Sequence, residues 1–170
     1  MDVIGSILGI LRWGNWKISK LTKPIKLKIK KKKFASCGDG FDIYGTPKVF
    51  FPQRIKLGNN VSLNDGCVLN ATESSIEIGD NCTISSYAQI LAATYDVQGF
   101  LMHHNTHHVS KPIVIGNNVW VCAGAIICPG VRILGGVIIA AGAVVTKDIT
   151  ETNVIIAGNP AKVVKHISVE

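Results

Sequence analysis

The sequence predicts an all-β fold, a parallel β-helix, from two observations. Aliphatic residues recur at every sixth position over most of the chain, and small or β-branched residues follow each of them four positions later. An α-helix repeats near 3.6 residues and a flat strand near two, so neither accounts for this period. Glycine and asparagine stand between the aliphatic positions, where they suit tight corners. Short repeated units of this kind bury a shared core only by stacking on their neighbours.

Two tracts of the chain carry the repeat. The aliphatic anchors of the units are Leu57, Leu63, Leu69, Ile78, Ile84, Ile90, Ile115, Val121, Ile127, Ile133, Ile139 and Val145. The small or β-branched positions are Val61, Cys67, Cys82, Ala88, Val119, Ala125, Val131, Val137, Ala143 and Ile149. Three units would close one triangular coil of about eighteen residues, which predicts about four coils with the anchors stacked inside. A β-sandwich is the competing interpretation, but it requires alternating strands and hairpin turns that the sequence lacks.

The first part of the chain differs from the repeats, and we expect residues 1–34 to form a separate arm with a short helix. Residues 1–33 have a net charge of +9, and the remaining residues have a net charge of −2. Residues 3–11 are apolar and are followed by Trp13 and Trp16. Two interpretations stay open: the arm packs on the end of the β-helix, or it contacts an anionic membrane surface. Nucleic-acid binding is not expected, because no basic groove studded with aromatic residues is evident.

The cysteines and the hydropathy of the chain indicate in which cellular compartment the protein works. The five cysteines are odd in number and have no C-x-x-C spacing, and Cys67 and Cys82 occupy small inward positions of the repeat. We therefore expect reduced, structural thiols. The sequence shows neither a signal-peptide cleavage site nor an apolar run of about 18 residues. A cytoplasmic protein is predicted, with peripheral attachment at the inner face of the cell membrane as an alternative.

The repeat is interrupted once. Ile90 should be followed by an anchor near residue 96, but the next anchor is Ile115, so residues 92–111 are predicted to leave the β-helix as a long loop. Long loops in compact folds are commonly functional. This loop contains four of the five histidines, whose side chains exchange protons near neutral pH. The four are His103, His104, His107 and His108.

Four tracts of the sequence resemble the hexapeptide-repeat acyltransferases, in particular sugar and polysaccharide O-acetyltransferases of the maltose and galactoside type. The tracts are PIVIGNNVW (112–120), CPGVRI (128–133), AAGAVVTKD (140–148) and AGNPAKVV (157–164). The resemblance covers residues 55–166. It implies a left-handed β-helix over residues 35–166 followed by a tail at 167–170. It further implies a homotrimer and acetyl-CoA as donor, and no metal is expected.

The resemblance implies an acetyltransferase that moves an acetyl group from acetyl-CoA directly to a hydroxyl of a saccharide, with a histidine as general base. In the family this histidine lies just after the strand that ends near residue 92, and here Tyr95 occupies its place. The loop is therefore expected to fold back and supply another histidine. The candidates are first His107 and His108, then His103 and His104. Tyr95 and Asp96 are expected to bind substrate, although Asp96 suits the capping of a turn equally well.

Other site residues are also implied by the resemblance. Asn64 matches an asparagine that faces the acceptor from the adjoining subunit, where its amide would hold a sugar hydroxyl or the oxyanion. Its alternative role is to turn a corner. The predicted coenzyme-binding residues are Trp120, Ala123, Ala141, Thr146, Lys147 and Lys162. Taken singly, Trp120 would equally be hydrophobic cover, and the lysines would equally be surface residues.

Three alternatives remain open. The acceptor would be an amine if the protein were an N-acetyltransferase acting on a nucleotide-linked amino sugar. The same fold hosts zinc hydratases, which need three histidines that converge at a subunit interface, whereas here the histidines crowd into one loop. Finally, Tyr95 in place of the usual base would fit a non-catalytic β-helical subunit.

Overall fold

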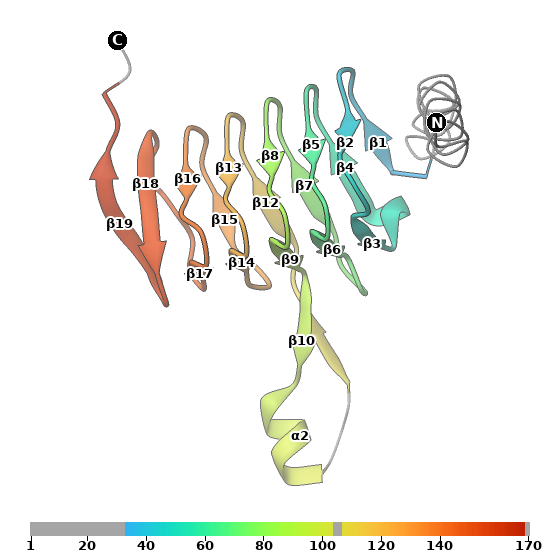
Figure 1. The fold of residues 1–170 in the computed structure, drawn as a ribbon. Helices are drawn as coiled ribbons and strands as arrows, with labels where there is room; N and C mark the ends of the chain where they lie inside the picture. Colours follow the sequence, from blue (N-terminus) through green and yellow to red (C-terminus); the bar gives the residue numbers. More distant parts are fainter. Residues whose placement is uncertain (1–32, 104–106, 169–170) are drawn as a thin grey trace, which may run out of the picture.

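The computed structural model describes residues 33–103 and 107–168, and in them short parallel strands coil into a three-faced stack (Figure 1). The strands of face one, in order along the stack, are β1 (Ser36–Cys37), β4 (Ile55–Leu57), β7 (Ile76–Ile78), β12 (Ile113–Ile115) and β15 (Arg132–Ile133). Those of face two are β2 (Asp42–Ile43), β5 (Ser62–Leu63), β8 (Thr83–Ile84), β13 (Trp120–Val121), β16 (Ile138–Ile139), β18 (Val154–Gly158) and β19 (Ala161–His166). Those of face three are β3 (Lys48–Phe50), β6 (Val68–Asn70), β9 (Gln89–Leu91), β14 (Ile126–Ile127) and β17 (Val144–Val145). The predicted β-helix is therefore present.

The stack has five coils, one more than the sequence predicted, because faces one and three each contain five strands. The additional coil is the first, in which Cys37, Ile43 and Val49 stand in register with the anchors of the next coil. These three side chains are only half-buried, because the first coil has a neighbour on one side only. Because side chains at the end of a stack are less buried, fewer aliphatic residues are needed there. The six-residue pattern therefore did not reveal the first coil.

The coils also vary in length. Val114 pairs with Arg132, an offset of 18 residues, as predicted. In the early coils Lys56 pairs with Glu77, an offset of 21 residues. The additional residues lie where face three turns into face one. There the first coil inserts a 3₁₀ turn, η1 (Pro52–Arg54).

The core of the stack is the column of anchors, as predicted. All twelve anchors and all ten small or β-branched positions named from the sequence are buried. Among the described residues no polar or charged side chain is buried with them. The burial of aliphatic side chains is therefore the main force that holds one coil on the next.

Asparagines turn the first corner, which joins face one to face two at residues 58–61, 79–82 and 116–119. Asn60, Asn81 and Asn118 all have positive φ, which asparagine tolerates better than most residues. The Nδ2 group of Asn60 donates to Asn81 Oδ1 at 3.0 Å, and that of Asn81 donates to Asn118 Oδ1 at 3.2 Å. The predicted corners are thus linked from coil to coil by a ladder of side-chain amides.

The predicted loop leaves the stack after β9, but it is more regular than a loop. It consists of β10 (Ala93–Tyr95), the helix α2 (Val97–His103) and β11 (His108–Ser110). β10 and β11 pair antiparallel, and Figure 1 shows this hairpin projecting away from the stack. The hairpin is closed at its base by a hydrogen bond from Lys111 N–H to the Ala92 carbonyl at 2.9 Å.

The far end of the stack is closed by a second antiparallel pair. β18 continues face two parallel to β16, and β19 then runs back along β18. The side chains of Ala161 and Val163 pack against the core from this last strand. In Figure 1, β1 and β19 lie at opposite ends of the stack.

The arm predicted at residues 1–34, with Trp13 and Trp16, lies almost wholly outside the described residues. Where the described chain begins, Phe34 packs edge-on against Phe41, with ring centroids 5.6 Å apart. Within residues 33–103 and 107–168, no helix has both the length and the hydropathy needed to cross a bilayer.

Candidate active site

The second corner, which joins face two to face three, contains several of the predicted site residues. It comprises residues 64–67, 85–88, 122–125 and 140–143 in coils two to five. Asn64 is half-buried there, and its Nδ2 group donates to the Ile84 carbonyl of the next coil at 3.0 Å. The Asn64 N–H donates to the same carbonyl at 2.9 Å. The side chain is thus oriented by the corner it helps to turn.

The backbone joins the later turns of the second corner into one column. Gly142 N–H donates to the Ala123 carbonyl at 3.0 Å, and Gly124 N–H donates to the Ser86 carbonyl at 3.1 Å. Ala123 and Ala141 are both exposed on this column, one coil apart. Two predicted coenzyme-binding residues therefore lie in line, with side chains small enough to let a thin ligand approach the backbone.

Trp120 lies beside this column. It stands on β13, in register with Thr83 and Ile138 of the neighbouring strands. Its side chain is 49% exposed, and its Nε1–H donates to Ser85 Oγ at 2.9 Å. The hydrogen bond ties the indole ring to the second corner, so Trp120 forms an apolar wall beside that corner.

A second group of predicted residues lies at the third corner, which joins face three to face one at residues 128–131 and 146–149. Thr146 and Lys147 are both exposed there. The neighbouring Asp148 accepts a hydrogen bond from the Arg132 N–H at 2.8 Å. The hairpin returns along the same corner, because a Cβ atom on Gly130 would lie only 3.0 Å from Lys111 Cδ.

Within the hairpin the structure brings Tyr95 and His108 together. They are direct cross-strand partners, and their rings stack with centroids 5.0 Å apart and planes inclined by 22°. Phe100 of α2 adds a third ring, 6.3 Å from that of Tyr95. The fold-back of the loop therefore places the His108 imidazole against the Tyr95 ring.

The other loop residues have different surroundings. Asp96 begins α2: its Oδ1 accepts from Gln98 N–H at 3.2 Å, which is the capping role considered from the sequence. Its own N–H donates to the His107 carbonyl at 3.0 Å. His107 is exposed. His103 is the last residue of α2, and His104 lies outside the described residues.

One chain does not bring all the predicted residues together. The turn that holds Asn64 leads into β6, whereas the hairpin follows β9, the parallel neighbour of β6. The second corner and the hairpin thus lie at opposite ends of three-residue strands, which are about 10 Å long. Lys162 lies neither at the second corner nor on the hairpin. It is exposed on β19, where it pairs with Ala157.

Comparison with known proteins identifies the family. The family description "Bacterial transferase hexapeptide (six repeats)" matches residues 112–147. A Dictyostelium discoideum protein provisionally named an acetyltransferase is 41% identical over 142 residues, which are 84% of this chain and 73% of that protein. The chain belongs to the hexapeptide-repeat acetyltransferases.

Solved structures of this family share the fold. A maltose O-acetyltransferase from Clostridium difficile 630 has a TM-score of 0.79 at 31% identity, and the match covers 89% of this chain and 83% of that one. A galactoside acetyltransferase in complex with coenzyme A has a TM-score of 0.76 at 32% identity, covering 81% and 68%. The predicted left-handed parallel β-helix is confirmed. A more distant relative is an Escherichia coli dTDP-4-amino-4,6-dideoxy-D-glucose acyltransferase, 27% identical over 164 residues, which are 81% of this chain and 84% of that protein.

Four of the five thiols of this acetyltransferase have a raised pKa. Cys67 and Cys82 are fully buried, as predicted. Burial raises the pKa of the Cys67 thiol to about 11 and also raises the pKa of Cys82. Burial likewise raises the pKa of the half-buried Cys122 and Cys128. These four thiols are protonated at neutral pH, so they are poor nucleophiles. In the two described stretches, no group of three or more His, Cys, Asp and Glu residues is arranged to hold a metal ion.

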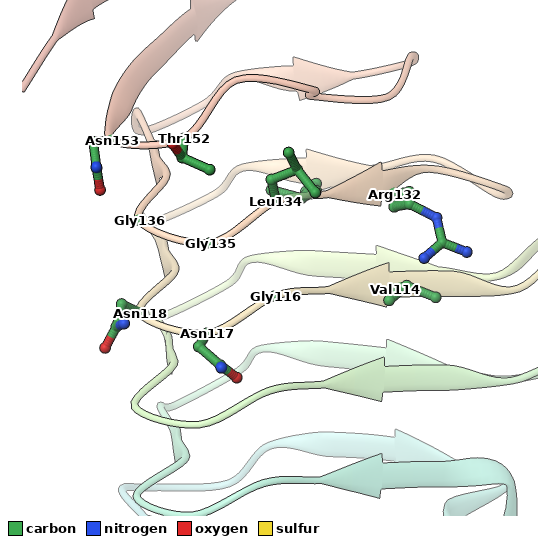
Figure 2. A pocket seen from close by; sticks show the side chains of 11 residues that line it. Val114, Gly116, Asn117, Asn118, Arg132, Leu134, Gly135, Gly136, Thr152 and Asn153 are labelled. Atoms are coloured by element: carbon green, nitrogen blue, oxygen red, sulfur yellow. The ribbon is translucent and has the colours of Figure 1, made fainter.

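An open groove of about 800 Å³ lies away from the predicted site of this acetyltransferase (Figure 2). It follows the first corner between the fourth and fifth coils, and Asn117, Arg132 and Asn153 are among its lining residues. None of the predicted site residues lines it. This difference is expected if the active site lies between two copies of the chain, because one copy alone then provides only one wall of the cleft.

Proposed function

We propose that this protein transfers an acetyl group from acetyl-CoA to a hydroxyl of a saccharide, a surface polysaccharide or its precursor. The observation that carries the proposal is the column at the second corner. Exposed Ala123 and Ala141 lie in line there, and the Trp120 ring is hydrogen-bonded to the same corner. A thin amide-bearing arm such as pantetheine fits along small residues beside an aromatic wall. The relatives named for maltose and galactoside acetyl transfer support a saccharide acceptor.

The proposed reaction is a direct transfer. An imidazole of the hairpin, foremost that of His108 or His107, removes the proton of the acceptor hydroxyl as its oxygen attacks the thioester carbon. The C–S bond then breaks, and the imidazolium protonates the departing thiolate of the coenzyme. Asn64 stabilises the oxyanion or holds the acceptor. The protonated state of the cysteine thiols supports a mechanism without an acyl-enzyme intermediate.

The coenzyme would lie lengthwise along the stack. Its pantetheine arm follows Ala123 and Ala141, and its nucleotide end reaches Thr146, Lys147 and Lys162. The ammonium groups of the two exposed lysines are suited to phosphate. In one copy, the proposed donor therefore contacts the last two coils and β19.

The functional unit in this proposal is a homotrimer. Asn64 and the hairpin lie at opposite ends of the face-three strands, so the second corner of one copy must meet the hairpin of the next to complete a site. Closed cyclic symmetry repeats such a heterologous contact three times. Location in the cytoplasm remains a prediction, and for residues 1–33 both packing on the end of the β-helix and contact with a membrane surface stay open.

A second candidate function is N-acetylation of a nucleotide-linked amino sugar. Two observations favour it: the relative named for a dTDP-amino-sugar substrate, and Tyr95 in the position of the family's base. An unprotonated amine is a better nucleophile than a hydroxyl, and it depends less on a general base.

One experiment separates the two functions. Purified full-length protein is given acetyl-CoA with maltose, galactosides, oligosaccharides or a nucleotide-linked amino sugar, and release of coenzyme A is followed with a thiol reagent. The product is then treated with mild alkali, which removes an acetyl ester but not an acetyl amide. Acceptor-dependent release with an alkali-labile product is expected. An alkali-stable product supports the second candidate, and no release with any of these acceptors contradicts both.

A further inference from the structure

Tyr87 has a backbone conformation that its residue type disfavours. Its φ is +60°, in the left-handed region that a bulky side chain rarely enters. Glycine fills the corresponding position of the second corner in the second, fourth and fifth coils, at Gly66, Gly124 and Gly142, all with positive φ. Among the second to fifth coils, the third is thus the one in which this position carries a side chain in place of glycine.

The fold gains little from this tyrosine. Its side chain is 65% exposed and is not part of the core. The Tyr87 N–H donates to the Asp65 carbonyl at 3.1 Å, but this is a backbone bond that glycine makes equally well, as Gly124 does in the next coil. A strained conformation at a residue that adds nothing to the core is typical of a residue kept for binding.

The neighbouring coil leaves room for the ring. A Cβ atom on Gly66 would lie 2.5 Å from Tyr87 Cε1 and 2.6 Å from Cδ1, so the aromatic ring covers the bare backbone of Gly66. One face of the ring is supported in this way, and the rest of the side chain is exposed to solvent. The Tyr87 ring therefore lies on the surface of the second corner with its other face open to solvent.

The Tyr87 ring lies where the acceptor would enter. Gly66 is two residues beyond Asn64, the residue expected to face the acceptor. Ser85, which fixes the Trp120 ring at 2.9 Å, is two residues before Tyr87. The column of Ala123 and Ala141 begins one coil further along the stack, so Tyr87 stands on the acceptor side of the proposed coenzyme path.

We infer that Tyr87 is the stacking platform for the acceptor saccharide, an inference that rests on the proposed function. A pyranose ring has an apolar face of C–H groups, which packs on an aromatic ring, while its hydroxyls need polar partners. Tyr87 supplies the apolar surface and Asn64 supplies the carboxamide. The acceptor class is therefore a sugar ring with one exposed C–H face.

Tyr87→Gly tests this directly, because it removes the ring and also relieves the left-handed conformation. The variant is expected to raise the KM for the saccharide at least roughly tenfold, with the KM for acetyl-CoA unchanged. Its Tm should equal or exceed that of the native protein, because glycine is favoured at positive φ. Tyr87→Phe keeps the aromatic ring, and its KM for the saccharide should stay within about twofold of the native value. Tyr44→Phe, at another exposed tyrosine of the same corner, is the matched control.

A Tyr87→Gly variant with an unchanged saccharide KM overturns the inference and leaves the proposed function standing. A fall in Tm with parallel losses in all kinetic constants also overturns it, because that result indicates a structural role. If the native protein acetylates no saccharide, the proposed function fails. Saturation-transfer NMR with maltose and galactosides then compares binding by the native protein and by Tyr87→Gly, and equal or absent binding overturns the inference as well.

Discussion

The Tyr95 and His108 rings stack at 5.0 Å across the two strands of the projecting hairpin. The stack fixes the plane of an imidazole that would otherwise rotate freely on an exposed strand. If Tyr95 stands in the place of the family's histidine, as the sequence predicts, the stack brings another imidazole next to that place. The register of the hairpin brings the two rings together. Ala93 pairs with Ser110, so Tyr95, two residues later, pairs with His108.

Replacement of the loop histidines tests the proposed base. His108→Ala is expected to lower kcat roughly 10²- to 10⁴-fold, with little change in the KM for acetyl-CoA, because general-base catalysis is lost and binding is kept. His107→Ala is measured beside it to decide between the two candidates. His166→Ala is the matched control, since His166 is an exposed histidine bound to Glu151 at 2.8 Å on the terminal strand. Full activity after the loss of all four loop histidines would contradict the proposed mechanism.

Tyr95 is expected to act as a positioning residue. Tyr95→Ala removes the surface on which the His108 ring lies and should lower kcat by roughly tenfold, while Tyr95→Phe, which keeps the stack, should retain most of the activity. Stopped assays of coenzyme A release measure both variants. Equal losses in the alanine and phenylalanine variants would instead indicate that the phenol hydroxyl is needed.

A core substitution tests the stacked column. Ile127→Ala empties a fully buried position between Ile90 and Val145 and should lower the free energy of unfolding by about 2–5 kcal/mol. Ile126→Ala, next to it on the same strand but only half-buried, is the control and should cost less. Denaturant titration of the two variants measures the difference. Equal effects would contradict the inward direction of the anchors.

The regular part of the fold could be predicted from the sequence because each six-residue unit repeats the same burial. An anchor such as Ile84 or Ile139 is identified by its spacing alone, and both are fully buried. The first coil could not be recognised as easily, because Cys37 at its end is half-buried and the aliphatic pattern weakens there. The return strand β19 was also missed, because its pairing depends on a turn and not on the repeat.

The site could be predicted only in part. The family motifs identify Ala123, Ala141 and Trp120 by position, and the structure places all three around one corner. The stacking of Tyr95 on His108 could not be predicted, because it depends on the register of two strands separated by a helix. The separation of Asn64 from the hairpin, at opposite ends of the face-three strands, could not be predicted from the sequence either, because it depends on where each turn falls on its coil.

The buried thiol of Cys67 makes stability depend on alkaline pH. Burial raises its pKa to about 11, from an ordinary value of 9.0. A group whose pKa is raised by folding contributes stability that is complete below the unfolded pKa and is lost as the pH rises through the folded pKa. The free energy of unfolding should therefore decrease between about pH 9 and pH 11. Cys67→Ala should show a smaller decrease over that range in urea titrations, and an identical pH profile would contradict the assignment.

Complementation between two inactive variants tests most directly whether the site is shared between copies. Asn64→Ala and His108→Ala chains, each inactive alone, are unfolded together, refolded as a mixture, and assayed for acetyl-CoA-dependent acetylation of the saccharide. If the second corner of one copy meets the hairpin of the next, random assembly restores about a quarter of the native activity, because that fraction of sites receives both intact residues. A refolded mixture as inactive as its parents would contradict a shared site.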